Sequence, residues 1–184
     1  MKRRKWLWTA PVAFGLFTLS VVGHAALSSA SDAHVSFQAS GPAGMKIEGT
    51  TSEMSVVDDG ANVVVTVPLA NLSTGIGLRD HHMKEKYLEV PKYPAATLTL
   101  ARGVLKFPAT GGEASGDVPA TVTLHGQSKP VTVHYDAKGA GPGLDAHGTF
   151  RVNMNDFGIS IPSYLGVTVK PDVDVSASFH VAGS

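Results

Sequence analysis

The sequence predicts a mainly β fold, either a closed up-and-down barrel or a sandwich of roughly eight antiparallel strands, with one short helix. Short runs of alternating apolar and polar residues fill the chain after Ala33, and turn-forming residues separate them. One charged segment without Gly or Pro, from Arg79 to Val90, breaks this alternation. A chain of 184 residues that is 43% apolar and 16% charged has the composition of a folded protein with one ordinary domain.

The composition excludes several classes of protein. The absence of Cys excludes disulfide scaffolds, thiolate zinc sites, iron–sulfur clusters and cysteine nucleophiles. Because 15 Lys+Arg balance 15 Asp+Glu, the chain lacks the concentrated basic surface of a nucleic-acid-binding protein. We therefore expect no nucleic-acid partner.

The start of the chain is typical of a secretory signal peptide. Basic residues 2–5 precede an uncharged run at 6–22, and Gly23-His24-Ala25 then places small residues at a cleavage position. The alternative is an uncleaved anchor, but a membrane span needs about 20 apolar residues and Pro11 interrupts this run. We expect cleavage near Ala25, which leaves residues 26–184 as a single soluble, exported domain. Eleven Lys+Arg then face 15 Asp+Glu, a formal charge of −4.

The strands are predicted from period-2 alternation. In the last of them, Val173, Val175, Ala177 and Phe179 share one face, and acidic residues and serines occupy the other. One apolar and one polar face in each strand indicates an antiparallel sheet that covers a single interior. The clearest segments are 62–69, 97–100, 121–124, 131–135, 149–154 and 172–179, with turn residues at 58–60, 111–112, 126–128 and 139–143.

The charged segment predicts the one helix. Met83, Tyr87 and Val90 have the i, i+4, i+7 spacing of one helical face. Asp80 is a candidate N-cap, and Pro91 would end the helix. We expect this helix to lie across a sheet edge or over a barrel end, either as a lid or as a packed satellite.

The sequence carries no catalytic or metal-binding signature. Seven histidines remain after cleavage, without a His-Glu-x-x-His motif or a His-x-His pair on one strand. Gly126-Gln127-Ser128 lacks the second glycine of a nucleophile elbow, and there is no phosphate-binding loop. We predict no catalytic residue, no metal and no cofactor, hence a protein that is not an enzyme.

The inner face of the predicted barrel is the remaining candidate for function. A barrel of about eight strands is either filled by side chains or holds one small ligand. Val, Ala and Thr dominate the strands and bulky aromatic residues are few, which favours a cavity. A tightly packed valine core is the alternative.

Three stretches of the sequence resemble the YceI-like family. The first stretch is Leu72-Ser73-Thr74-Gly75 together with residues 78–84 and 87–97. The second is Val122–Val131, which contains Leu124-His125-Gly126. The third is Gly148–Ile159, which contains Asn153-Met154-Asn155-Asp156-Phe157. They occur in the right order across most of residues 33–181. The resemblance implies an extended lipocalin-like antiparallel β-barrel with one short helix, located in the bacterial periplasm or secreted beyond it.

The resemblance also implies a function. Members of the family bind a long lipophile in the barrel, such as a polyisoprenoid, an isoprenoid quinone, a fatty amide or a hydrophobic drug. A non-enzymatic carrier or sequestering protein is therefore expected. The alternatives are an enzyme that acts on an isoprenoid head group through His82 and Asp80, and an interaction module that recruits a membrane partner protein. Whether the chain forms a homodimer is left open.

Two sets of residues are candidates for ligand contact. Arg79, Asp80 and His82 are predicted to orient the head group, although Arg79 and Asp80 could instead fix the start of the helix. The predicted tunnel lining is Val65, Val67, Met83, Tyr87, Leu98, Leu100, Val122, Leu124, Val133, Phe150, Val152, Val175 and Phe179.

Overall fold

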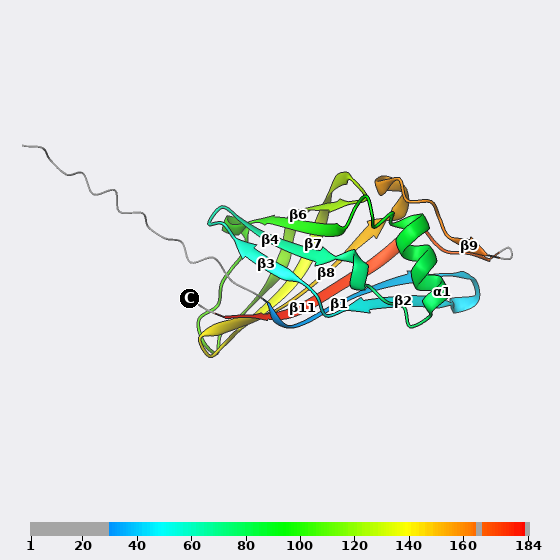
Figure 1. Cartoon of the computed structure of the whole chain (residues 1–184). Coiled ribbons are helices and arrows are strands. Elements are labelled where there is room, and N and C mark those ends of the chain that lie inside the picture. Colours follow the sequence, from blue (N-terminus) through cyan, green and yellow to red (C-terminus); the bar gives the residue numbers. More distant parts are fainter. Residues whose placement is uncertain (1–29, 165–166, 183–184) are drawn as a thin grey trace, which may run out of the picture.

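The computed structural model describes residues 30–164 and 167–182. Nine of its strands form one curled antiparallel sheet, a half-barrel, in the order β2-β1-β11-β8-β7-β6-β5-β4-β3 (Figure 1). This confirms the predicted mainly β, lipocalin-like architecture. The strands are β1 (Ser31–Ser40), β2 (Lys46–Thr51), β3 (Ser55–Asp58), β4 (Asn62–Pro68), β5 (Ala95–Ala101), β6 (Glu113–Leu124), β7 (Gln127–Ala140), β8 (Gly143–Asn153) and β11 (Asp172–Val181). The predicted signal peptide lies outside the described residues.

Smaller elements complete the fold. The two-stranded ribbon of β9 (Ser163–Tyr164) and β10 (Val167–Thr168) is separate from the main sheet. Single 3-10 turns are η1 (Pro42–Gly44), η2 (Leu69–Asn71), η4 (Arg102–Val104) and η5 (Met154–Phe157). No helix among the described residues is long and apolar enough to cross a membrane.

The period-2 pattern of the sequence gives the sheet one buried face. Along β6, for example, Val118, Ala120 and Val122 are buried, and the residues between them are exposed. Cross-strand pairing continues this face from strand to strand, as in the row Val65–Leu98–Val122 across β4, β5 and β6. Around the most buried side chain, Phe157, the core contains Ala39, Val122, Val152, Ile159, Val169 and Val173.

A tight turn joins β6 to β7. Leu124 pairs with Gln127, which leaves His125 and Gly126 as a two-residue loop, and both have positive φ (51° and 72°). This is the type I′ geometry that suits the twist of a hairpin. A Cβ on Gly126 would lie 2.6 Å from the ring of Tyr93, so glycine is required here for space as well as for conformation.

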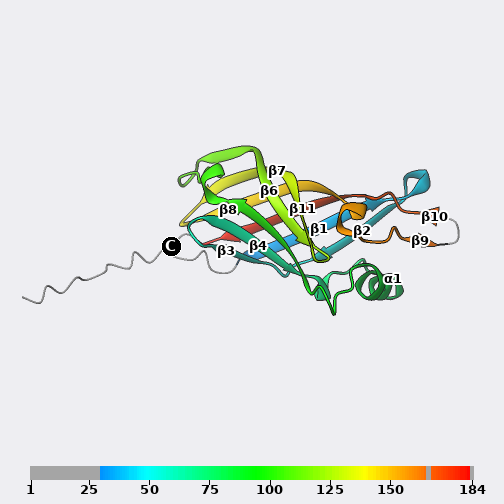
Figure 2. The same ribbon diagram turned by 90° about the horizontal axis from the view of Figure 1, so that it is seen from above.

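The predicted helix is present, but it begins earlier than expected. It consists of α1 (Gly77–His82) continued by the π-helical turn η3 (Met83–Tyr87). The N-cap is Ile76, which makes no side-chain cap, so the prediction that Asp80 is the N-cap is wrong. The Asp80 carboxylate instead accepts hydrogen bonds from the preceding loop. Both views show α1 at the end of the half-barrel that lies away from the β7–β8 hairpin (Figures 1 and 2).

Candidate functional site

The lining residues predicted on strands share the side of the half-barrel that forms the core, which we call the inner face. Five of them are buried: Val65, Leu100, Val122, Val133 and Val152. Eight of the predicted lining residues are only half-buried: Val67, Met83, Tyr87, Leu98, Leu124, Phe150, Val175 and Phe179. Large apolar side chains on the inner face therefore keep part of their surface accessible, as a site for an apolar ligand requires.

Leu98 has a central position on the inner face. It packs against each of the three groups of buried residues that form the core, around Phe157, Val133 and Val56. It is itself only half-buried. Leu98 is therefore the lining residue best placed to report on occupation of the inner face.

The helical segment covers one end of this inner face. Tyr87 and Leu88 pack against the core around Phe157, and Met83 and Tyr87 are half-buried. The segment is thus attached by packing, as in the satellite alternative. It also contributes apolar surface to the inner face, as in the lid alternative.

A polar contact that the sequence did not predict fixes the end of this segment. The His125 ring places Nε2 3.0 Å from Glu89 Oε2 and Nδ1 3.0 Å from the carbonyl oxygen of Phe157. Its centroid lies 4.6 Å from that of the Tyr93 ring, and the two ring planes are tilted by 57°. The ring therefore links Glu89, at the end of the helical segment, to the backbone of Phe157 in η5. No catalytic or metal-binding sequence motif contains His125. Its place beside Gly126 in a hairpin turn was the available signal.

The structure places Arg79 and Asp80 against the loop before the helix. Arg79 donates from Nε to Thr74 Oγ1 (2.7 Å) and from a terminal nitrogen to the Thr74 carbonyl oxygen (2.8 Å). Asp80 accepts from Ser73 Oγ (2.7 Å), from the Thr74 N–H (2.7 Å) and from the Thr74 hydroxyl. These bonds favour the alternative in which the pair fixes the start of the helix. His82 lies on the exposed side of α1, and a head-group role for the three residues stays a prediction.

The hydrogen bonds to Asp80 determine its charge. Partial burial would raise the pKa of Asp80, but the Thr74 and Ser73 hydroxyls, the Thr74 N–H and the charge of Lys84 together hold the pKa below its usual value. Asp80 is therefore an ionised acceptor at neutral pH, and its hydrogen bonds are charge-assisted.

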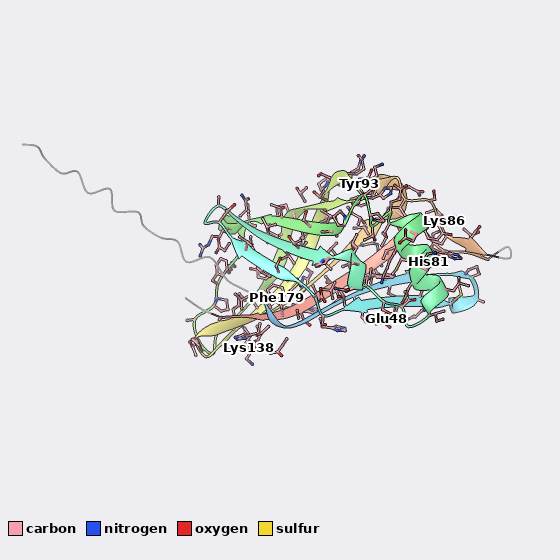
Figure 3. All side chains as sticks on the ribbon, in the orientation of Figure 1. Glu48, His81, Lys86, Tyr93, Lys138 and Phe179 are labelled. Carbon is pink, nitrogen blue, oxygen red and sulfur yellow. The ribbon has the colours of Figure 1, made fainter. Side chains whose placement is uncertain are left out.

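A cavity of about 680 Å³ lies at the opposite end of the sheet, near the β7–β8 hairpin. Of the predicted lining residues it contains only Phe179. We call it the outer hollow, because its polar residues lie in register on the outer face of their strands. Residues from the inner face also line it, and these are Ala114, Ala137, Ala146 and Phe179. It is lined by Asp32, Glu113, Ala114, Ser115, Asp136, Ala137, Lys138, Asp145, Ala146, His147, Ser178, Phe179 and His180. In Figure 3, Lys138 and Phe179 mark this end.

The outer hollow and its surroundings carry hydrogen-bonded His and Asp pairs. Nδ1 of His134 lies 2.7 Å from Asp117 Oδ1, and Nδ1 of His180 lies 2.7 Å from Asp145 Oδ1. The hydrogen bond to Asp117 and the charges of Asp117 and Asp136 raise the pKa of His134. Within residues 30–164 and 167–182, no three His, Asp or Glu side chains are arranged to hold one metal ion. The outer hollow thus combines hydrogen-bonded polar side chains with the apolar side chains of three alanines and Phe179.

Comparison with known proteins places the chain among bacterial relatives. The model of the YceI-like domain family matches residues 26–181. A UPF0312 protein of Pseudomonas savastanoi pv. phaseolicola is 34% identical over 140 residues, which cover 70% of this chain and 67% of the relative.

Solved structures share the fold. A polyisoprenoid-binding domain from Saccharophagus degradans, implicated in plant cell wall breakdown, aligns with a TM-score of 0.72 and 15% identity, over 85% of this chain and 97% of that one. BcnA of Burkholderia cenocepacia aligns with a TM-score of 0.63 and 18% identity, over 83% and 96% of the two chains. At these identities the similarity establishes the architecture.

Proposed function

The chain belongs to the YceI-like family, and on that premise we propose that it binds an extended lipophilic ligand along its inner face and carries or sequesters it. Ligands of this class are a polyisoprenoid, an isoprenoid quinone, a fatty amide or a hydrophobic drug. The structural neighbour from Saccharophagus degradans is described as a polyisoprenoid-binding domain, and this supports the choice of class.

The single observation that carries the proposal is the incomplete burial of the inner face. Leu98, Phe150 and Val175 lie on the core side of their strands and remain half-buried. An apolar ligand laid against such side chains removes further apolar surface from water. Each Å² is worth about 25 cal/mol, so about 400 Å² gives of the order of 10 kcal/mol before binding costs of several kcal/mol. No catalytic group is needed, and the protein acts by binding.

The test is to identify what the protein carries. The mature protein is purified from a bacterial host, weighed by native mass spectrometry and extracted with organic solvent. We expect a stoichiometric polyprenyl, quinone or fatty species. A bare protein mass, together with no uptake of an added isoprenoid quinone, would contradict the proposal.

A matched pair of variants locates the ligand. Leu98→Trp fills the inner face at a half-buried position, and Thr121→Trp adds the same side chain to the exposed side of the adjacent strand. The first variant is expected to lose quinone uptake and the second to keep it, with circular dichroism as the check of folding. Equal uptake by both folded variants would mean that the ligand lies elsewhere.

We also propose that the protein acts outside the cytoplasm, in the periplasm or beyond. The support is the basic start, the uncharged run and the small residues that end at Ala25. The mass of the protein recovered from the periplasmic fraction tests this proposal. A mass that begins near residue 26 is expected, and a full-length protein retained with membranes would contradict it.

A further inference from the structure

We propose that the exposed side of the helical segment docks on the surface of an anionic phospholipid bilayer. We call this surface the docking face, and it consists of Ile76, Leu78, Lys86 and Lys92. Figure 3 labels His81 and Lys86 on the same segment. The inference comes from exposed apolar side chains, the way they are held, and the distribution of charge.

The first observation is apolar exposure. Ile76 is 53% exposed and Leu78 is 68% exposed, the highest values for large hydrophobic side chains among the described residues. They are two residues apart at the start of α1. Large aliphatic side chains presented together to solvent mark an interaction site more often than isolated ones do.

The second observation is that polar contacts hold these side chains outward. Arg79 and Asp80 are bonded to the preceding loop at Thr74, and Glu89 is bonded to His125 at the far end of the segment. Tyr87 packs into the core from the opposite side. The segment is thus fixed at both ends and along its inner side, so the exposure of Leu78 is a property of the fold.

The third observation is charge. Residues 76–92 contain four basic and three acidic residues, a net formal charge of +1. Arg79, Asp80 and Glu89 make hydrogen bonds within the fold, and the remaining charged side chains are Glu85 and three lysines. Lys86 and Lys92 are exposed. The outer hollow at the other end presents four carboxylates and one lysine. This polarity turns the helix end toward an anionic surface and the hairpin end away from it.

The combination of aliphatic tips and lysines fits a bilayer. Lysines near anionic lipid head groups attract the protein from a distance, and aliphatic side chains then enter the head-group region. Tyr87 and Leu88 of the same segment pack against the core around Phe157, so a docked protein would bring the inner face next to the lipid. This last consequence rests on the proposed function, whereas docking itself does not.

The test is sedimentation with vesicles, using the chain from residue 26 onward, which contains every described strand. Vesicles of pure phosphatidylcholine are compared with an equal mixture of phosphatidylcholine and phosphatidylglycerol. We expect binding to the mixed vesicles that weakens with added salt, and little binding to the pure ones. The double variant I76S/L78S is expected to reduce partition about tenfold. The double variant K86Q/K92Q should reduce it about fivefold for each lysine.

Matched variants at other sites are the controls. Val57→Ser removes a 48% exposed aliphatic side chain from β3, and K106Q/K138Q removes two lysines from the hairpin end. Both controls should bind mixed vesicles like the parent chain. Controls that lose binding equally, or docking-face variants that keep it, would overturn the proposal. So would self-association or capture of a protein partner through this face without vesicle binding. Quinone uptake without vesicles is measured separately, so a failure of docking is distinguishable from a failure of ligand binding.

Discussion

The helix end and the hairpin end of the half-barrel belong to one sheet but differ in chemistry. At the helix end, apolar side chains around Phe157 meet a helical segment that is fixed by a few polar contacts. At the hairpin end, the outer hollow is lined by carboxylates, imidazoles and hydroxyls together with three alanines and Phe179. The described cavity lies at the hairpin end, whereas the apolar ligand is proposed for the inner face. The chemistry of the surface, more than the volume of a cavity, indicates the function.

The two ends also differ in how much each polar contact contributes to the free energy of unfolding. The His134 and Asp117 side chains at the hairpin end are 53% and 70% exposed, and such pairs contribute little because water screens them. His125 at the helix end is 13% exposed. We therefore expect substitutions at the helix end to have the larger effects on stability.

The largest effect should come from removing an aromatic ring at each end. Phe157→Ala empties a site that is 1% exposed, and the expected loss is about 3–5 kcal/mol of unfolding free energy. Phe107, at the hairpin end, is 42% exposed with the Arg102 guanidinium over its ring, so Phe107→Ala should cost about 1 kcal/mol or less. Urea denaturation measures both. Equal losses of unfolding free energy in the two variants would contradict the proposed difference between the ends.

The next effect compares a glycine in each hairpin turn. Gly126 and Gly141 both have positive φ (72° and 57°), so an alanine at either position costs about 1–2 kcal/mol of strain. A Cβ on Gly126 would also press on the Tyr93 ring, whereas nothing lies within 4 Å of one on Gly141. Gly126→Ala should therefore be the more destabilising in thermal unfolding. The reverse order would show that the Tyr93 contact is not a constraint.

Asp80→Asn tests the contact that fixes the helix start. Loss of the charged acceptor should cost about 1–3 kcal/mol. The pKa of Asp80 is lowered in the folded protein, so its contribution is present above the unfolded value of 3.8 and is lost as the pH falls through the folded pKa. Unfolding free energies of parent and variant should differ at neutral pH and converge in acid. A constant difference at all pH values would contradict this role.

The smallest effect is expected at His134. Its pKa is raised above 6.5 in the folded protein, so its contribution is fully present below that value and is lost as the pH rises through the folded pKa. His134→Gln should therefore lower the melting temperature slightly in mild acid and not at all at alkaline pH. A larger decrease in melting temperature at alkaline pH would contradict a stabilising role for protonated His134.

Much of the fold could be predicted from sequence because its cause is local. The alternation of Val173, Val175, Ala177 and Phe179 is visible in the chain, and β11 follows it. Strand β2 is harder to predict from sequence, because Ile47 is its one large apolar residue. Its strand conformation depends on its pairing with β1. The helix start was misplaced for a related reason: the partners of Asp80 are loop residues Ser73 and Thr74.

The candidate site was only partly predictable because it depends on register. Which strand side chains face inward follows from alternation, and the lining residues predicted on strands share the core side of the sheet. The contact of His125 with Glu89 joins positions 36 apart in sequence, and that of His134 with Asp117 joins positions 17 apart. Neither spacing has a local signature. The outer hollow likewise exists only once five strands are paired.

The most direct test of the central claim places one tryptophan at each end. The chain's two Trp residues, Trp6 and Trp8, precede residue 26, so a single introduced Trp reports alone in the shortened chain. Tyr87→Trp reports on the inner face at the helix end, and His147→Trp reports on the outer hollow. Titration with an isoprenoid quinone should quench Tyr87→Trp saturably at one equivalent and His147→Trp only gradually. Saturable quenching of His147→Trp alone, or equal quenching of both, would contradict binding of the lipophile on the inner face.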